Sequence, residues 1–259
     1  MIFPPVYNVH DDHGRRGWYR RGWVYALVEE RKILKIGLME RFLFPGFPVL
    51  VDIPIGLPET GERVCDKLAR KILSKRAGCV FTVPVREAVY QKTYEDALMI
   101  NRKKQGKGFS VQFWNIVEKV REVDLFLREN PSLVSVIRES HPELCFLRLS
   151  GRLLASKHTE EGIKQRIDVL RRFLTLDVKE LKKTEERLKV ALHDLLDALV
   201  LALSGQFSLE TIPENPPNDR YGLPMSIKIP KIINGRWNFL STVSPSRFPS
   251  VLLQSLVGY

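Results

Sequence analysis

The feature that most constrains the fold is the apolar run from Val49 to Pro58, which carries a single charged residue, Asp52. A run rich in β-branched residues that ends at prolines is typical of a central strand covered on both faces, because such a strand has no polar side. An ionised carboxylate at the end of a buried strand costs several kcal/mol when it has no partner. We therefore expect a cation to lie next to Asp52.

Three short strands are expected before this run, at residues 6–9, 23–28 and 33–39, and the charged turn 29–32 separates the last two. Consecutive strands joined by short turns form an antiparallel meander. The run at 49–53 then adds a fourth strand. The first half of the chain thus predicts most of a sheet.

Helices are expected to follow the fourth strand. One begins near Glu62 and places on one face Val64, Leu68 and Ile72. Another follows Ser110, which is a favourable N-cap, and its apolar face is interrupted by Asp124. The stretch 76–108 between them is irregular and basic.

The second half is expected to hold a strand at 133–139, a helix with apolar residues from Ile163 to Leu174, and a long helix whose apolar residues run from Leu181 to Leu203. A short strand at 225–229 follows a region rich in proline. This order of elements predicts an α/β fold in which helices pack on the faces of a mixed sheet.

Composition sets the remaining limits. At 259 residues the chain is long enough for one elaborated domain, which we place at 1–230, with an insertion at about 76–130 and a C-terminal extension at 231–259.

The net charge of +11 favours a polyanionic partner such as nucleic acid. No apolar stretch reaches the roughly 18 residues that a membrane span needs, so we expect a cytoplasmic protein. The cysteines are odd in number and form no C-x-x-C pair, which argues against disulfides and thiolate zinc sites: Cys65, Cys79 and Cys145.

Several carboxylates stand where a soluble protein seldom puts them. Asp194 and Asp197 are three apart on the last helix, so they are neighbours that repel unless a cation or a proton lies between them. Glu143 follows the strand at 133–139, and the pair Asp11-Asp12 follows the first strand. Each could instead be a solvated surface acid. Taken together with Asp52, they suit Mg²⁺ or Mn²⁺, which prefer oxygen ligands.

Six ordered blocks of the chain resemble one family. They are D-I-P-I-G-L-P at 52–58, R-V-C-D-K-L-A-R at 63–70, G-F-S-V-Q-F-W at 108–114, E-S-H-P-E-L-C-F at 139–146, S-K-H-T-E-E-G at 156–162 and D-L-L-D-A-L at 194–199. This is the domain-of-unknown-function family four-twenty-nine, described as a predicted nuclease family of the ribonuclease H-like fold. The resemblance covers roughly residues 6–230.

The resemblance implies a five-stranded mixed sheet flanked by helices, with a helical and basic insertion between strands four and five. It also implies a nuclease that hydrolyses phosphodiester bonds with two divalent metal ions, Mg²⁺ or Mn²⁺. In the wider superfamily, acids after the first strand, after the fourth strand and on the last helix hold these ions. Carried onto this chain, the catalytic and metal-binding positions are Asp12, Asp52, Glu143, Asp194 and Asp197.

One departure concerns the turn after the first strand. Family members resemble a strand, an Asp, a short turn, Gly-Trp and a second strand, whereas Gly-Trp occurs here twice, at Gly17-Trp18 and Gly22-Trp23. The turn therefore holds about five extra residues, and the choice between Asp11 and Asp12 stays open.

Several basic residues and one histidine are candidates for roles around these acids. Arg63 and Arg70 could clamp a phosphate, or belong to a surface salt-bridge ladder with Asp66. Lys157 could neutralise charge in the transition state, or be a solvated loop residue. We expect His141 to be structural rather than a donor that orients Glu143.

The basic turns 15–21 and 102–107 resemble a surface that tracks a nucleic-acid strand, although Trp18 and Trp23 could equally be core residues.

Two other classes of function compete with the nuclease. A non-catalytic nucleic-acid-binding module would keep the acids for structural reasons alone. An actin-like or hexokinase-like phosphotransferase needs a glycine-rich phosphate loop after the first strand, but that turn here is bulky and cationic, from His13 to Trp18. The sequence leaves open the oligomeric state and the choice among DNA, RNA and smaller phosphoesters.

Overall fold

The computed structural model describes residues 6–9, 22–233 and 236–237. Five strands form one mixed sheet in the order β3-β2-β1-β4-β5. In this sheet β1 is antiparallel to β2 and parallel to β4, and β4 is parallel to β5. The expected α/β class is confirmed. The bounds of these strands are β1 Val6–Val9, β2 Trp23–Glu29, β3 Lys32–Met39, β4 Val49–Val51 and β5 Ile137–Glu139.

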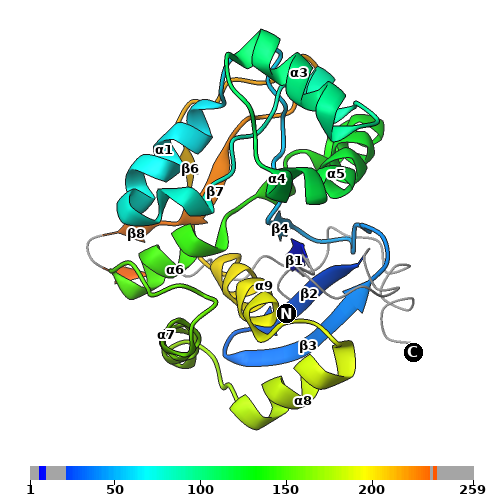
Figure 1. Cartoon of the computed structure of the whole chain (residues 1–259). Helices are drawn as coiled ribbons and strands as arrows, with labels where there is room; N and C mark the ends of the chain where they lie inside the picture. Colours follow the sequence, from blue (N-terminus) through cyan, green and yellow to red (C-terminus); the bar gives the residue numbers. More distant parts are fainter. Residues whose placement is uncertain (1–5, 10–21, 234–235, 238–259) are drawn as a thin grey trace.

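Both faces of the sheet are covered by helices (Figure 1). Alternate residues of β2 point to opposite faces, so Val24 packs with the late helices and Trp23 with the middle ones. The same alternation divides β4, whose three residues are all buried. The prediction of a buried central strand is therefore confirmed. The late helices are α6 Pro142–Ser150, α7 Glu160–Arg171, α8 Val178–Leu188 and α9 Leu192–Ser204.

The segment between β4 and β5 supplies the cover of the opposite face. Ser110 caps α4 as expected, because its side chain accepts a hydrogen bond from the backbone N–H of Phe113. Asp124 interrupts the apolar face of α5 because it forms a buried ion pair with Arg86, at 2.7 Å. The helices are α1 Val64–Leu73, α2 Arg86–Val89, α3 Tyr94–Gln105, α4 Val111–Asn115 and α5 Val117–Glu129, with 3₁₀ turns at Ser74–Cys79 and Pro131–Leu133.

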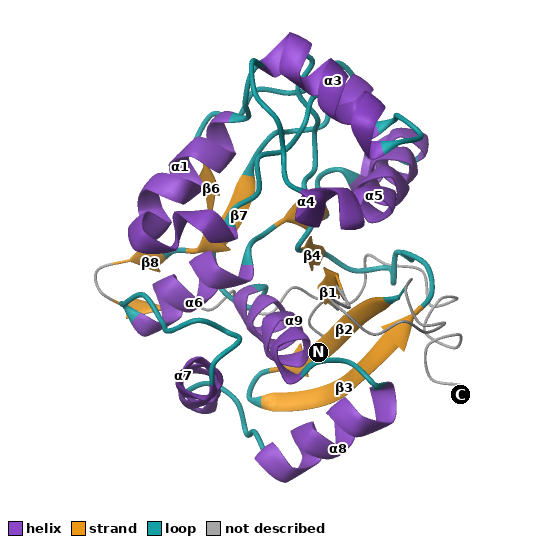
Figure 2. Ribbon diagram, viewed as in Figure 1, coloured by secondary structure: helices purple, strands orange, loops and turns teal. Residues whose placement is uncertain are grey.

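A small satellite sheet lies beside α1 (Figure 2). Strands β6, Leu209–Ile212, and β7, Ile227–Pro230, pair antiparallel, and a bridge from Ser140 to Lys228 connects β7 to the end of β5. The expected strand at 225–229 is thus confirmed with shifted bounds, whereas β6 was not predicted. The short strands β8, Ile232–Ile233, and β9, Arg236–Trp237, form a hairpin.

Two expectations about helices need correction. Of the expected apolar face of α1, Leu68 and Ile72 pack against the core but Val64 is 45% exposed, and the fully buried residues lie one position further along, at Cys65, Ala69 and Leu73. The long helix from Leu181 to Leu203 is two helices, α8 and α9, since Lys189 adopts a left-handed backbone with φ of 54° and ends the first of them.

Trp23 is completely buried, which confirms it as a core residue. Asp11, Asp12, Trp18, the basic turn 15–21, the phosphate-loop candidate 13–18 and the end of the tail at 238–259 lie outside the described residues. Within the described part of the chain, no helix is both long and apolar enough to cross a membrane.

Candidate active site

The predicted acids that the structure describes converge on one cavity of about 370 Å³, which we call the acidic cavity. Its lining includes the side chains of Asp52, Glu143, Asp194 and Asp197. Asp52 directly follows β4, and Glu143 lies in the first turn of α6, just after β5. Because β4 and β5 are parallel, their carboxyl ends meet at the same edge of the sheet. Helix α9, which packs against α6, brings Asp194 and Asp197 to that edge.

Asp52 lies in an unfavourable place for a charge. Its pKa is raised from 3.8 to about 6, mainly by burial; His141 and Lys157 oppose this rise, while the charges of Asp197 and Glu143 contribute to it. Within the described residues, its carboxylate has no hydrogen bond or ion pair. The cations expected next to Asp52 are therefore near it, but none of them is bonded to it.

Asp197 is only half satisfied. Its Oδ2 accepts a hydrogen bond from Lys157 Nζ at 2.7 Å, whereas its Oδ1 is buried without a hydrogen-bond partner among the described residues. Although burial alone would lower the pKa of Lys157, the carboxylates of Asp197, Asp194 and Asp52 raise it above its ordinary value, so the ammonium stays charged. The orphaned oxygen of Asp197 is a ligand position that the protein leaves unused.

Glu143 has cationic partners of its own. Arg166, which is fully buried, donates a hydrogen bond to Glu143 Oε1, and Arg76 lies 3.6 Å from the same oxygen. His141 does not orient Glu143: its Nε2 lies 3.2 Å from the backbone carbonyl oxygen of Cys79. The structural role expected for His141 fits this contact.

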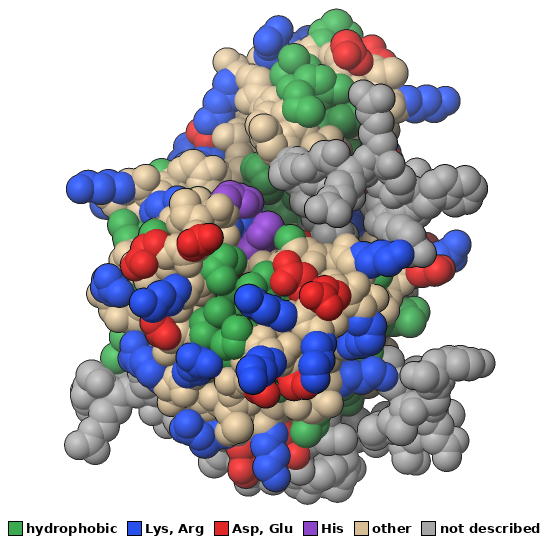
Figure 3. Space-filling model, turned by 60° about the horizontal axis from the view of Figure 1, so that its bottom comes forward, with side chains coloured by type: hydrophobic (Ala, Val, Ile, Leu, Met, Phe, Trp, Pro, Cys, Tyr) green, Lys and Arg blue, Asp and Glu red, His purple; other side chains and the backbone are tan. Residues whose placement is uncertain are grey.

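Histidines border the acidic cavity in a way that the sequence did not predict. The rings of His158 and His193 meet edge to face with centroids 4.9 Å apart, and both residues line the cavity. Burial lowers the pKa of His193, whose Nε2 lies 3.5 Å from Asp194 Oδ1. Figure 3 shows histidine side chains gathered at a hollow of the surface, with acidic and basic side chains nearby.

Carboxylate oxygens are ligands that suit a hard divalent cation. No group of three or more His, Cys, Asp or Glu side chains in the described part of the chain is placed to hold an ion. Mg²⁺, however, keeps several water ligands and is usually bound by only one or two carboxylates together with substrate phosphates. The unbonded carboxylate of Asp52 and the orphaned oxygen of Asp197 can supply two such carboxylates.

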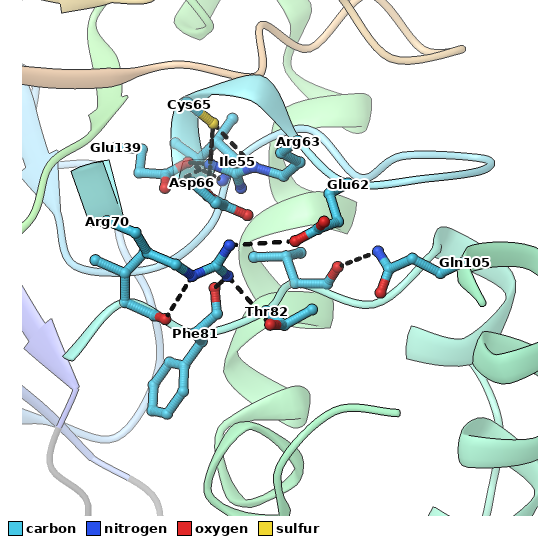
Figure 4. A network of polar contacts seen from close by, with 12 residues as sticks. Ile55, Glu62, Arg63, Cys65, Asp66, Arg70, Phe81, Thr82, Gln105 and Glu139 are labelled. Carbon is cyan, nitrogen blue, oxygen red and sulfur yellow. Dashed lines mark hydrogen bonds and ion pairs between the residues drawn. The ribbon is translucent and has the colours of Figure 1, made fainter. Parts of the chain in front are cut away.

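The phosphate clamp predicted from Arg63 is wrong, because this side chain is sealed in the interior (Figure 4). Its Nη2 donates to both oxygens of Glu139 at 2.7 Å and lies 3.2 Å from Asp66 Oδ1. The side chain of Arg63 is 0% exposed and cannot reach a substrate. The alternative of a surface ladder with Asp66 is also wrong, since the pair is buried.

Arg70 likewise bonds residues close to it in the sequence and not a substrate site. It donates to the backbone carbonyl oxygens of Val80 and Phe81, and lies 3.2 Å from Glu62 Oε2 (Figure 4). These contacts tie α1 to the segment that follows it, and Arg70 does not line the acidic cavity. Of the predicted substrate-binding residues, only Lys157 faces the acids.

The sequence analysis did not predict the hydrogen bonds and ion pairs around Glu139. Glu139 ends β5 next to the E-S-H-P-E block, and its Oε2 accepts a hydrogen bond from the backbone N–H of Ile55 at 2.7 Å. Burial raises the pKa of Glu139 to about 7, while Arg63 opposes that rise. The sequence does hold one signal for this network, because Glu139, like Asp52, is a carboxylate at the end of an expected strand.

The raised pKa of Asp52 predicts how stability depends on pH without divalent ions. A carboxyl group whose pKa is higher in the folded than in the unfolded state costs stability above the folded pKa, and this cost disappears as pH falls below the unfolded pKa. The Asp52→Asn variant should therefore match the wild type below about pH 3 and exceed it by roughly 2–3 kcal/mol above about pH 7. Urea unfolding of both proteins in chelator measures the difference, and a constant offset at every pH would contradict this assignment.

Gly162 sets the position of Lys157. A Cβ atom at Gly162, in the first turn of α7, would lie 1.8 Å from the carbonyl oxygen of Ser156, the residue before Lys157. We expect Gly162→Ala to push this backbone away and to cost about 1–3 kcal/mol in unfolding free energy. Gly78→Ala is the matched control, because nothing lies within 4 Å of its Cβ position. Equal denaturation midpoints for the two variants would refute the close approach.

A family model described as "Protein of unknown function (DUF429)" matches residues 19–220. No curated protein and no solved structure matches the chain. The matched range contains Asp52, Glu143, Asp194 and Asp197, whereas Asp12 precedes it.

Proposed function

We propose that this chain, which belongs to the protein family of unknown function DUF429, is a divalent-metal-dependent nuclease that hydrolyses phosphodiester bonds. The observation that carries the proposal is the meeting of acids from distant segments at one cavity, where one carboxylate has no bonded partner among the described residues and another keeps a buried oxygen unused. Such an arrangement costs stability, so a function is the better reason for it.

The sheet supports the ribonuclease H-like part of the proposal. Its strand order, β3-β2-β1-β4-β5, places two parallel strands beside an antiparallel meander, as the family resemblance implies. The acids lie at the carboxyl ends of β4 and β5, where open α/β sheets bind their ligands. Fold alone does not decide function, so the proposal depends on the side chains.

Asp52 and Asp197 would hold Mg²⁺ or Mn²⁺, with Asp194 and Glu143 beside them and Asp12 as a further ligand outside the described residues. Divalent ions in such a site stabilise the charge on a phosphodiester and lower the pKa of a bound water. The protein's own contribution is to fix carboxylates from three elements on a rigid frame, so that little has to move when the ions enter.

Lys157 has a separate part in the proposed reaction. It keeps a positive charge beside Asp197 and faces the acidic cavity, where it could bind a non-bridging oxygen of a substrate phosphate. Arg166 and Arg76 hold Glu143 at the cavity wall and limit its freedom to move. The net charge of +11 favours a polyanionic substrate such as DNA or RNA.

One observation favours a second candidate, a nucleic-acid-binding module without catalysis. Glu143 and Asp197 already have cationic partners, as expected if these acids serve only the fold. This candidate requires binding without hydrolysis and indifference to divalent ions. The orphaned Oδ1 of Asp197 favours the nuclease over it.

A cleavage assay separates the two candidates. Purified protein is incubated with end-labelled single-stranded, duplex and branched DNA and with RNA, in Mg²⁺, in Mn²⁺ and in chelator. We expect hydrolysis of at least one substrate class in either metal and none in chelator. Binding with no cleavage under every condition would refute the nuclease and leave the binding module.

A further inference from the structure

Another cavity, of about 780 Å³, lies along the outer side of β5 and is called the basic cavity below. One wall comes from the end of α5 and from residues 131–139, and the opposite wall from residues 216–228. Glu139 borders both this cavity and the acidic one, so the two lie on either side of the end of β5.

The junction of β5 with β7 brings two cations to this cavity. Ser140 bridges to Lys228, and its Oγ donates a hydrogen bond to the carbonyl oxygen of Lys228 at 2.6 Å. Arg138, on the edge strand β5, and Lys228, on β7, both line the basic cavity. They are close enough that the charge of Arg138 contributes to lowering the pKa of Lys228.

Neither cation is neutralised by an acid in the described part of the chain. Arg138 donates only to the carbonyl oxygen of Ser135, at 2.7 Å, and Lys228 donates to the hydroxyl of Thr211. Glu139, the acid that lines the cavity, is occupied by Arg63. Burial lowers the pKa of both cations, which marks an unfavourable site for positive charge.

The fully buried arginines of the described residues, in contrast, all have an acidic partner. Arg63, Arg86 and Arg166 each face a carboxylate within hydrogen-bonding distance. Arg128, at the rim of the basic cavity, lies 3.5 Å from Asp124. Arg138 and Lys228 therefore stand out as like charges that share a cavity and lack a counter-ion.

We propose that the basic cavity binds a phosphate group, held between Arg138 and Lys228. A guanidinium fork and an ammonium together suit the oxygens of a phosphomonoester, and the cavity has the size of a small-molecule site. The phosphate could belong to a mononucleotide or to the end of a nucleic-acid strand. The inference does not depend on the acidic cavity or on any metal.

Isothermal titration in chelator tests the proposal with inorganic phosphate and with a nucleoside 5′-monophosphate as probes. The double variant Arg138→Gln/Lys228→Gln should bind both probes about tenfold more weakly or worse. Without phosphate it should unfold at the same temperature as the wild type or higher, because a repulsive pair has been removed. Phosphate should raise the unfolding temperature of the wild type and leave that of the double variant unchanged.

The matched control is Arg152→Gln/Lys164→Gln, which removes the same charge from exposed positions. The proposal would be overturned if the double variant Arg138→Gln/Lys228→Gln bound phosphate as tightly as the wild type. It would also be overturned if the control lost as much phosphate affinity as the double variant. The Asp52→Asn variant should bind phosphate normally, so failure of this proposal is distinguishable from failure of the nuclease.

Oligonucleotides with and without a 5′-phosphate identify the source of the phosphate group. Tighter binding of the phosphorylated strand than of the mononucleotide assigns the site to strand ends, and the reverse preference assigns it to a small molecule.

Discussion

Asp52→Asn should reduce phosphodiester hydrolysis by at least about a hundredfold, the order of loss when one preorganised group is removed from a charge-stabilising site. Asn keeps the shape of the side chain and loses the charge that would hold a divalent ion. The same change removes a carboxylate whose burial raises its pKa to about 6, so the variant should fold at least as stably as the wild type without metal. Loss of activity would then not be a consequence of unfolding.

The comparison needs a control that changes charge elsewhere. Asp168→Asn, at an exposed position of α7, removes the same charge far from any role proposed here and should cleave at the wild-type rate. Rates are measured in Mg²⁺ at saturating substrate, with the unfolding free energy of each protein determined in parallel. An Asp52→Asn protein that cuts as fast as Asp168→Asn would end the assignment of Asp52 to catalysis.

Arg63→Met should be the most destabilising of the substitutions considered, at about 3–5 kcal/mol, because it leaves Glu139 and Asp66 buried without their cation. Burial already raises the pKa of Glu139 to about 7, and removal of Arg63 should raise it further. The folded variant should therefore hold a proton at Glu139 at pH values where the wild type does not, so that its deficit in stability shrinks as pH falls toward about 7, below which Glu139 is neutral in both proteins.

Lys67→Met supplies the comparison for Arg63→Met. It removes a cation from the same helix, but its side chain is 58% exposed and lies 3.8 Å from Glu62, so we expect a change below about 0.5 kcal/mol. Guanidinium unfolding curves give both values. An Arg63→Met protein of normal stability and reduced activity would instead revive a substrate-binding role for this arginine.

Local patterns in the sequence predict much of the fold. The apolar run at 49–53 predicts a strand buried on both faces, and β4 has this environment, with Leu50 on one side and Val51 on the other. Ser110 predicts the start of α4 because capping is a local hydrogen bond. Acids at the ends of strands and on the last helix predict a shared cavity, because parallel strands bring their carboxyl ends to one edge.

The features that the sequence did not predict depend on partners remote along the chain. Arg63 bonds Glu139, which is 76 positions away, and a surface ladder on α1 was the simpler interpretation of its spacing. The buried face of helix α1 also lies about one residue beyond its expected apolar face, because Cys65 and Ala69 belong to the same buried core as Leu144 and Ile227. The contact of His158 with His193 joins a loop to α9, and no short-range spacing announces it.

The charge of a side chain can be read from the sequence, but its counter-ion cannot. Asp124 breaks the apolar pattern of α5 visibly, yet only the fold shows that Arg86 neutralises it while also bonding Asp219, and that the Tyr90 hydroxyl donates a hydrogen bond to it. Arg138 and Lys228 give no local signal at all, because their isolation is a property of the cavity between β5 and β7. A charged side chain that lacks a counter-ion can therefore be recognised only in the folded structure.

The central claim is that the acidic cavity holds divalent ions between Asp52 and Asp197. Anomalous diffraction from crystals soaked in Mn²⁺ tests it most directly. We predict a manganese peak within bonding distance of carboxylate oxygens of both residues, including Oδ1 of Asp197. A cavity without a peak at full soaking would contradict the claim.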